Sequence, residues 1–194
     1  MYRCSMLAGA ILAAAATAMS AAGANAQQFQ AKLSGFLEVG PLNAETGAIF
    51  SPTGQGTLAL KLDQKAQSLT YTLTYSGLTS LVQQAHIHFG KIHVPGGIFL
   101  FLCTNLGNGD VGTPLCPNPS ATGSNAVTGM LTAANVRAIT GQNITAGDFS
   151  IVPAALLSDT AYVNVHTENF KAGEIRGEIR RPEDDQQGQN QNQQ

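Results

Sequence analysis

The chain alternates polar and apolar residues over Tyr162-Val163-Asn164-Val165-His166-Thr167, and again over Gly173-Glu174-Ile175-Arg176-Gly177-Glu178-Ile179. An alternation with a period of two is typical of a β-strand that has one polar and one apolar face. The short connection from Glu168 to Gly173 suits an antiparallel hairpin, so we expect His166 and Glu174 to lie near each other. The two segments therefore predict neighbouring strands.

A third segment of the same kind is Ala85-His86-Ile87-His88-Phe89-Gly90. Residues two apart share a face of a strand, so His86 and His88 point one way and Ile87 points the other. Together with His166, three of the four histidines of the chain lie on predicted polar strand faces. These faces are the first place to look for a site.

The rest of the chain also favours strands. Four further runs have the alternation or the apolar, Thr-rich and aromatic composition of strands: Phe29–Leu33, Thr57–Leu62, Ser68–Tyr75 and Ile98–Leu102. The second and third of these form a predicted hairpin. Short helices are predicted at 132–139, capped by Thr132, and at 148–157, where Pro153 limits the helix unless it lies in the first turn. The pattern predicts an all-β fold, an immunoglobulin-like β-sandwich or Greek-key barrel with one or two short helical insertions.

The N-terminus has the features of a signal peptide. Arg3 precedes an apolar run from Met6 to Met19, and Ala24-Asn25-Ala26 matches a cleavage site. We therefore expect residues 1–26 to be removed, residues 27–180 to form one domain, and residues 181–194, rich in Gln and Asn, to be a disordered polar tail. The product is expected to be exported to the periplasm, the cell surface or the medium, with no membrane span after cleavage.

Composition excludes several classes of function. The formal net charge is −2 at pH 7, and it becomes one unit more negative without Arg3. That balance argues against a nucleic-acid or anionic-membrane surface. The chain has no Gly-x-Ser-x-Gly elbow, phosphate-binding loop or dinucleotide fingerprint, so no catalytic residue is predicted.

Two cysteines remain once Cys4 leaves with the signal peptide. Cys103 and Cys116 flank a connection rich in Gly and Pro with little apolar content. In an oxidising compartment such a pair usually forms a disulfide, and we predict one here. A metal-binding pair of thiols is the alternative, although no second cluster of cysteines supports it.

The histidines carry two alternative interpretations. One is a copper or zinc site made by His86, His88 and His166, to which His93 or Glu174 would add a ligand. Imidazole suits several transition metals, so the ligand type alone does not name the ion.

The other interpretation is a buried polar network. Its members would be the same histidines together with His93, Tyr162, Asn164, Glu174 and Arg176. For the charged residues Glu174, Arg176 and Glu178, we expect cross-strand pairing on a solvated face rather than acid–base catalysis. Spacing alone favours the network over the metal site.

These segments resemble the CHRD domain family, which takes its name from chordin and occurs in many bacterial exported proteins. The resemblance covers nearly all of the chain after the signal peptide. It rests on Leu33-Ser34-Gly35 with Glu38-Val39 and Pro41, Leu69–Leu73 with Ser76-Gly77-Leu78, Ala85–Gly90 with Pro95-Gly96-Gly97, and the closing pair 162–167 and 173–179. The resemblance implies an immunoglobulin-like β-barrel or sandwich, and no settled activity. The insertion between Cys103 and Cys116 departs from the plainest form of the family.

Two functions are therefore expected. The first is an exported, non-enzymatic structural or binding module, with an unknown extracytoplasmic protein or small ligand as its partner. The alternative is a copper- or zinc-binding protein that uses the strand histidines. Its His-x-His pair is similar to that of copper–zinc superoxide dismutase, but the similarity ends at His86 and His88.

Overall fold

The computed structural model describes residues 26–39, 51–118 and 125–184. The predicted signal peptide lies outside these ranges except for Ala26, which begins the first strand. The predicted tail lies outside them from residue 185 onward, and at its start Arg181 forms an ion pair with Asp184 (3.1 Å).

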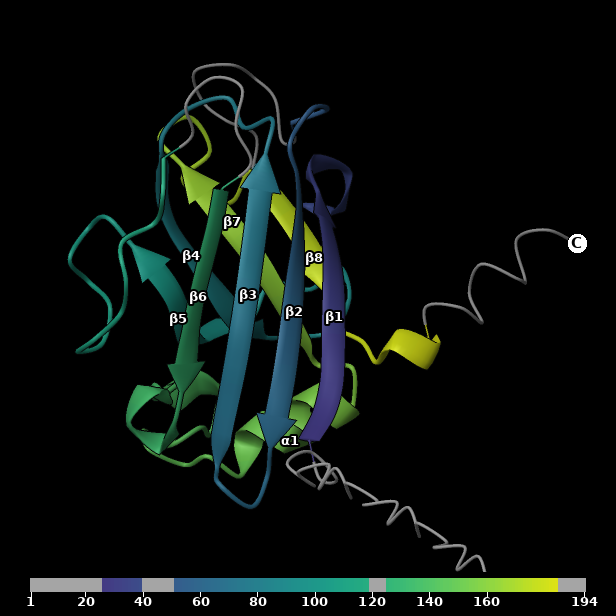
Figure 1. Ribbon diagram of the computed structural model, residues 1–194, viewed down its shortest axis with the longest axis vertical. Helices are drawn as coiled ribbons and strands as arrows, with labels where there is room; N and C mark the ends of the chain where they lie inside the picture. Colours follow the sequence, from purple (N-terminus) through teal and green to yellow (C-terminus); the bar gives the residue numbers. More distant parts are fainter. Residues whose placement is uncertain (1–25, 40–50, 119–124, 185–194) are drawn as a thin grey trace, which may run out of the picture.

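One antiparallel sheet of eight strands is the main regular structure of the described chain, which confirms the all-β prediction (Figure 1). Its spatial order is β5-β4-β7-β8-β1-β2-β3-β6. The strands are β1 (Ala26–Ser34), β2 (Gln55–Asp63), β3 (Ser68–Ser76), β4 (Val82–Phe89), β5 (Gly97–Thr104), β6 (Asn125–Leu131), β7 (Ala161–Thr167) and β8 (Ile175–Glu178). All four further runs predicted as strands lie within strands, and β2 and β3 form the predicted hairpin, with Asp63 opposite Ser68.

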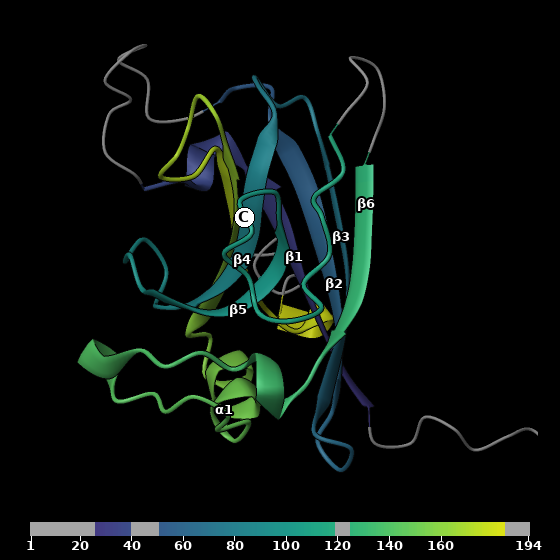
Figure 2. The same ribbon diagram turned by 90° about the vertical axis from the view of Figure 1, so that its left-hand side faces the viewer.

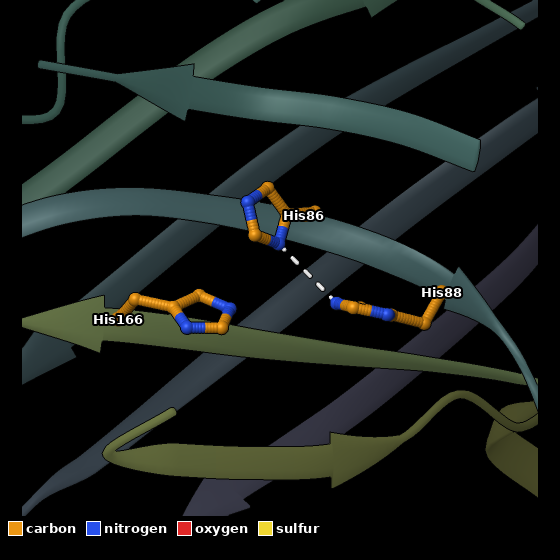
Figure 3. A group of neighbouring side chains, drawn as sticks. All are labelled: His86, His88 and His166. Carbon is orange, nitrogen blue, oxygen red and sulfur yellow. Dashed lines mark hydrogen bonds between the residues drawn. The ribbon is translucent and has the colours of Figure 1, made fainter. Parts of the chain in front are cut away.

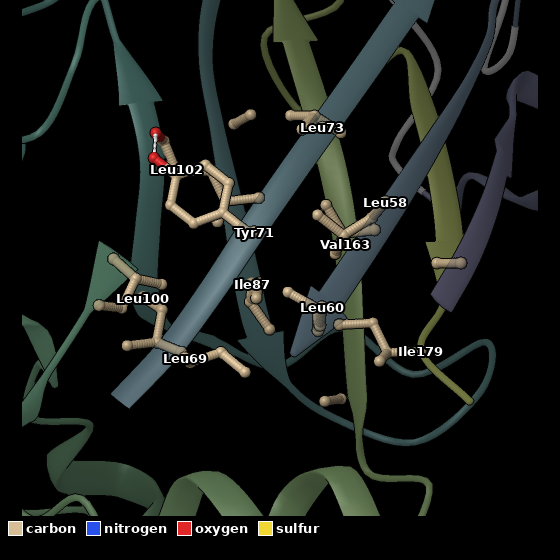
Figure 4. Packing of buried hydrophobic residues seen from close by; sticks show 14 of the residues in the cluster. Leu58, Leu60, Leu69, Tyr71, Leu73, Ile87, Leu100, Leu102, Val163 and Ile179 are labelled. Carbon is tan, nitrogen blue, oxygen red and sulfur yellow. Dashed lines mark hydrogen bonds between the residues drawn. The ribbon is translucent and has the colours of Figure 1, made fainter. Parts of the chain in front are cut away.

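The sheet curls into a nearly closed barrel, and its edge strands β5 and β6 contact each other (Figures 1 and 2). The Tyr71 hydroxyl on β3 donates to the backbone carbonyl of Leu102 on β5, which ties the two sides together. Apolar residues of alternate strand positions fill the interior, as expected from their period of two (Figure 4). Leu69, Leu73 and Ile87 are fully buried there.

The helix α1 (Ile151–Leu157) closes one end of the barrel with Val152, Ala155 and Leu156 in the core (Figure 1). The predicted helix at 148–157 begins only at Ile151, so Pro153 lies in the first turn, where its missing N–H costs no intrahelical hydrogen bond.

The predicted helix at 132–139 is wrong beyond one turn. Only Ala133–Asn135 form a 3₁₀ turn, after Thr132, whose backbone N–H donates to Oδ1 of Asn135. The chain leaves the turn because Val136 is buried and Arg137 donates its backbone N–H to Phe99 on β5. Tertiary contacts thus override the local helical signal.

The disulfide between Cys103 and Cys116 is present, as predicted. Both cysteines are buried, Cys103 on β5 and Cys116 in the connection that follows it. The side chain of Asn105 donates to the carbonyls of Val82 and Cys116 and accepts from the Cys116 N–H, so the stapled connection is held against the start of β4. None of the helices in the described ranges has the length and apolar character needed to cross a membrane.

Candidate metal centre

The outer faces of β4, β7 and β8 carry a continuous polar stripe. The register places His86 opposite Asn164, which in turn lies opposite Arg176, and it places His88 opposite Tyr162. His166 lies opposite Gln84 one step further along. The intervening residues point into the barrel, so the alternation seen in the sequence separates the polar stripe from the core.

Three imidazoles meet on this stripe, and all three are buried. One ring nitrogen from each of His86, His88 and His166 lies within 4.8 Å of the other two (Figure 3). Nδ1 of His86 is 3.2 Å from Nε2 of His88. The structure therefore brings together the three histidines that the sequence analysis proposed as ligands, from two neighbouring strands.

Backbone carbonyls orient two of the three rings. Nδ1 of His88 donates to the Gly96 carbonyl (2.8 Å), and Nδ1 of His166 donates to the Lys171 carbonyl (2.9 Å). Because a carbonyl only accepts, each Nδ1 carries a proton and each Nε2 keeps its lone pair in the neutral ring. Protein ligands of metal ions are commonly held in this way by a hydrogen bond at the second nitrogen.

His86 completes the group. Its Nδ1 donates to Nε2 of His88, and its buried Nε2 has no hydrogen-bond partner among the described residues. A buried polar atom without a partner costs about 1–3 kcal/mol, and a metal ion bound at Nδ1 of His86 would leave that cost unchanged.

Burial keeps the imidazoles neutral. It lowers the pKa of His86 to about 2, helped by repulsion from His166 and His88, and the pKa of His166 to about 4, where the bond to Lys171 opposes the shift. The pKa of His88 is also lowered by burial, against the effect of its bond to Gly96. Neutral imidazoles are the form that binds metal ions.

A carboxylate lies on the far side of Asn164. Glu38 is buried, and its Oε2 has no hydrogen-bond partner in the described part of the chain. Burial raises the pKa of Glu38, while the Val39 N–H, the charge of Arg176 and the Asn164 amide lower it. Gly173, at a φ of +130°, leaves the room for this carboxylate, because a Cβ there would overlap Oε2.

Aromatic and cationic groups flank the histidines. The ring of Tyr162 stacks on His88, and the guanidinium of Arg176 lies 3.4 Å from the centroid of the Tyr162 ring. The expected cross-strand pairing on a solvated face is wrong, because Arg176 is fully buried and bonds Glu178 of its own strand (2.9 Å). Arg176 also donates to the carbonyls of Lys91 and Val94. Its burial is explained by these acceptors on the segment that follows β4.

Two of the candidate residues lie elsewhere. His93 is in an exposed turn with a φ of +58°. Glu174 is fully buried, but its carboxylate accepts from the backbone N–H and hydroxyl of Thr79 and from the hydroxyl of Thr167. That carboxylate ties β7 to the segment before β4 and is not one of the groups around the imidazoles.

Sequence analysis missed Glu38 and the two carbonyls that orient the rings. The carbonyls of Gly96 and Lys171 carry no side-chain signal at all. Glu38 was noted only as part of the opening motif, since its distance in sequence from the histidines gave no reason to place it beside Asn164.

A family model of the CHRD domain matches residues 29–179. The chain belongs to the CHRD family. CHRD domains are extracellular-type domains, and the disulfide of this CHRD protein is consistent with that setting. No curated protein and no solved structure matches the chain.

Proposed function

We propose that this CHRD protein is an exported binding module whose ligand is a single copper or zinc ion held by His86, His88 and His166. The proposal is carried by one observation, the convergence of three buried imidazole nitrogens within 4.8 Å. Export is supported by the disulfide and by the N-terminal sequence.

One pair of the nitrogens has the spacing that a metal ion requires. Two nitrogens bound tetrahedrally at roughly 2.0–2.1 Å from one ion are about 3.3 Å apart, and the separation of His86 Nδ1 from His88 Nε2 is 3.2 Å. The Nε2 atom of His166 is the remaining donor, because its Nδ1 is already engaged by Lys171. Three neutral nitrogen donors are expected to bind copper(II) more tightly than the other first-row divalent ions.

A structural polar network is the second candidate function, and one observation favours it. Apart from Nε2 of His86, every nitrogen of the three rings lies within hydrogen-bond distance of a polar atom. Under this alternative the histidines would support the fold of a module that binds its partner elsewhere, and the ring nitrogens would bind no metal ion.

Metal analysis of the untagged protein separates the two candidates. The full chain is incubated with CuSO₄ or ZnSO₄, desalted and analysed for metal, and about one ion per chain is expected. His86→Leu, His88→Leu and His166→Leu should each lose most of the metal. His93→Asn is the matched control, since it removes the exposed histidine and Asn tolerates the positive φ.

Copper(II) EPR adds a second readout, because coordinated imidazoles give resolvable nitrogen couplings. The absence of stoichiometric copper, zinc, iron or nickel after each metal has been offered would remove the metal proposal and leave the structural network. Equal metal binding by His93→Asn and by the three Leu variants would also count against this site.

A further inference from the structure

Asn164 lies beside His86 and His166 on the polar stripe. It faces His86 directly across β4 and β7, and its Oδ1 is 2.9 Å from Nε2 of His166. Its side chain is buried with them.

The contact between Asn164 and His166 joins two acceptors. The single proton of the neutral His166 ring is on Nδ1, which donates to the Lys171 carbonyl, so Nε2 presents a lone pair. Oδ1 of Asn164 presents another lone pair to it at 2.9 Å. With no hydrogen between them the two atoms repel each other, whereas a cation beside both would bind each of them.

Glu38 explains why the amide has this orientation. Turning the Asn164 amide over would bring Nδ2 to His166, but it would also turn Oδ1 toward the carboxylate of Glu38. In the present orientation Nδ2 lies on the side of the Glu38 carboxylate, because Nδ2 and Oε2 of Glu38 both approach the same point beside Gly173. Gly173 gives both groups their space, since a Cβ there would overlap Oε2 of Glu38 and lie 3.0 Å from Nδ2 of Asn164.

We propose that Oδ1 of Asn164 is the fourth ligand of the metal ion, and that Glu38 is a positioning residue that holds this oxygen toward it. The inference rests on the proposed three-histidine site and completes it as three nitrogens and one oxygen. Two donors roughly 2.0–2.2 Å from one ion are about 2.8–3.6 Å apart for angles between 90° and the tetrahedral angle, and the 2.9 Å contact fits the 90° end of that range. An amide oxygen is a hard donor, so the set favours zinc(II) or copper(II) over copper(I).

Three variants of the full, untagged chain test the assignment. Asn164→Leu removes the oxygen at similar volume, Glu38→Gln replaces the carboxylate beside the amide with a neutral amide of the same shape, and the double variant Asn164→Asp/Glu38→Gln restores an oxygen facing the histidines and a donor behind it. The dissociation constant for zinc(II) is measured by competition with a chelator, the EPR spectrum is recorded with copper(II), and copper(I) affinity is measured in parallel.

Asn164→Leu is expected to weaken zinc(II) binding about 10–100-fold and to change the copper(II) EPR parameters, with copper(I) affinity within about threefold of wild type. Glu38→Gln should weaken zinc(II) binding less, and the double variant should recover it. Wild-type zinc(II) affinity and an unchanged EPR spectrum in Asn164→Leu would overturn the assignment while leaving the three-histidine site intact. Equal losses for zinc(II) and copper(I) would show a structural role and overturn it too, and a wild-type chain that binds no metal would overturn the three-histidine proposal itself.

Discussion

The imidazole of His88 lies flat against the ring of Tyr162, with centroids 4.7 Å apart and planes inclined by 7°. The guanidinium of Arg176 covers the same ring and must take its other face. The Tyr162 hydroxyl accepts from the Gly96 N–H (3.0 Å), and the Gly96 carbonyl accepts from His88. Tyr162 therefore fixes both the plane of the His88 ring and the segment that orients it.

Removing only the Tyr162 hydroxyl should weaken this arrangement modestly. Tyr162→Phe keeps both stacking contacts and leaves the Gly96 N–H without its acceptor, at a cost of about 1 kcal/mol in the free energy of unfolding. Tyr162→Leu also loses the stack and the cation–π contact and should cost about 3 kcal/mol. Urea denaturation measures both, and equal losses in the two variants would refute the role given to the stacked ring.

Gly173 should not tolerate a side chain. Gly173→Ala places a Cβ against the Glu38 carboxylate at a φ of +130°, and we expect a loss of about 2 kcal/mol in stability. Gly141→Ala is the matched control, because no atom lies within 4 Å of a Cβ at that exposed position. Urea denaturation of the two variants should separate them clearly. Similar stabilities would mean that the contact between Gly173 and Glu38 is not tight.

The disulfide should stabilise the protein mainly by restricting the conformations of the unfolded chain. Cys103→Ala/Cys116→Ala opens a loop with a sequence separation of 13, and the chain-entropy model gives a loss of about 3 kcal/mol. Thermal or urea denaturation of the double variant and of the reduced wild type should show losses of the same size. A reduced protein as stable as the oxidised one would contradict this prediction.

Acid should destabilise the metal-free protein. The pKa of His166 is lowered to about 4 and that of His86 to about 2, so below pH 6.5 the unfolded chain binds protons that the folded chain refuses. The contribution of these histidines to the free energy of unfolding is therefore complete above about pH 6.5. Below that pH it falls by about 1.4 kcal/mol per pH unit for each histidine, and for His166 the fall ends at about pH 4.

Urea denaturation at pH 7, 6 and 5 measures this slope. His166→Gln should reduce the slope of the free energy of unfolding against pH by the amount that one histidine contributes. His93→Asn, which removes the exposed histidine, should leave the slope close to that of the wild type. The comparison within each pH cancels the carboxyl groups, including Glu38, whose pKa is raised by burial. An identical slope in His166→Gln and wild type would show that His166 is not kept neutral by the fold.

The strands were predictable because their signal is local. The period-two alternation of 85–90 and 162–167 assigned each histidine to a face correctly, and the composition of the remaining runs located the other strands. The helix predicted at 132–139 failed because its competitor was not local. Val136 and Arg137 gain more from the core and from the edge of β5 than from continuing a short helix.

By itself the sequence determined the family, the all-β class, the cysteine pair and the faces on which His86, His88 and His166 lie. Only the tertiary structure decided that the three rings meet, that Asn164 lies among them and that Glu38 stands behind it. The physical reason is that alternation along a strand fixes which way a side chain points. The neighbour it meets depends on strand order and register, which arise from contacts between segments far apart in the chain.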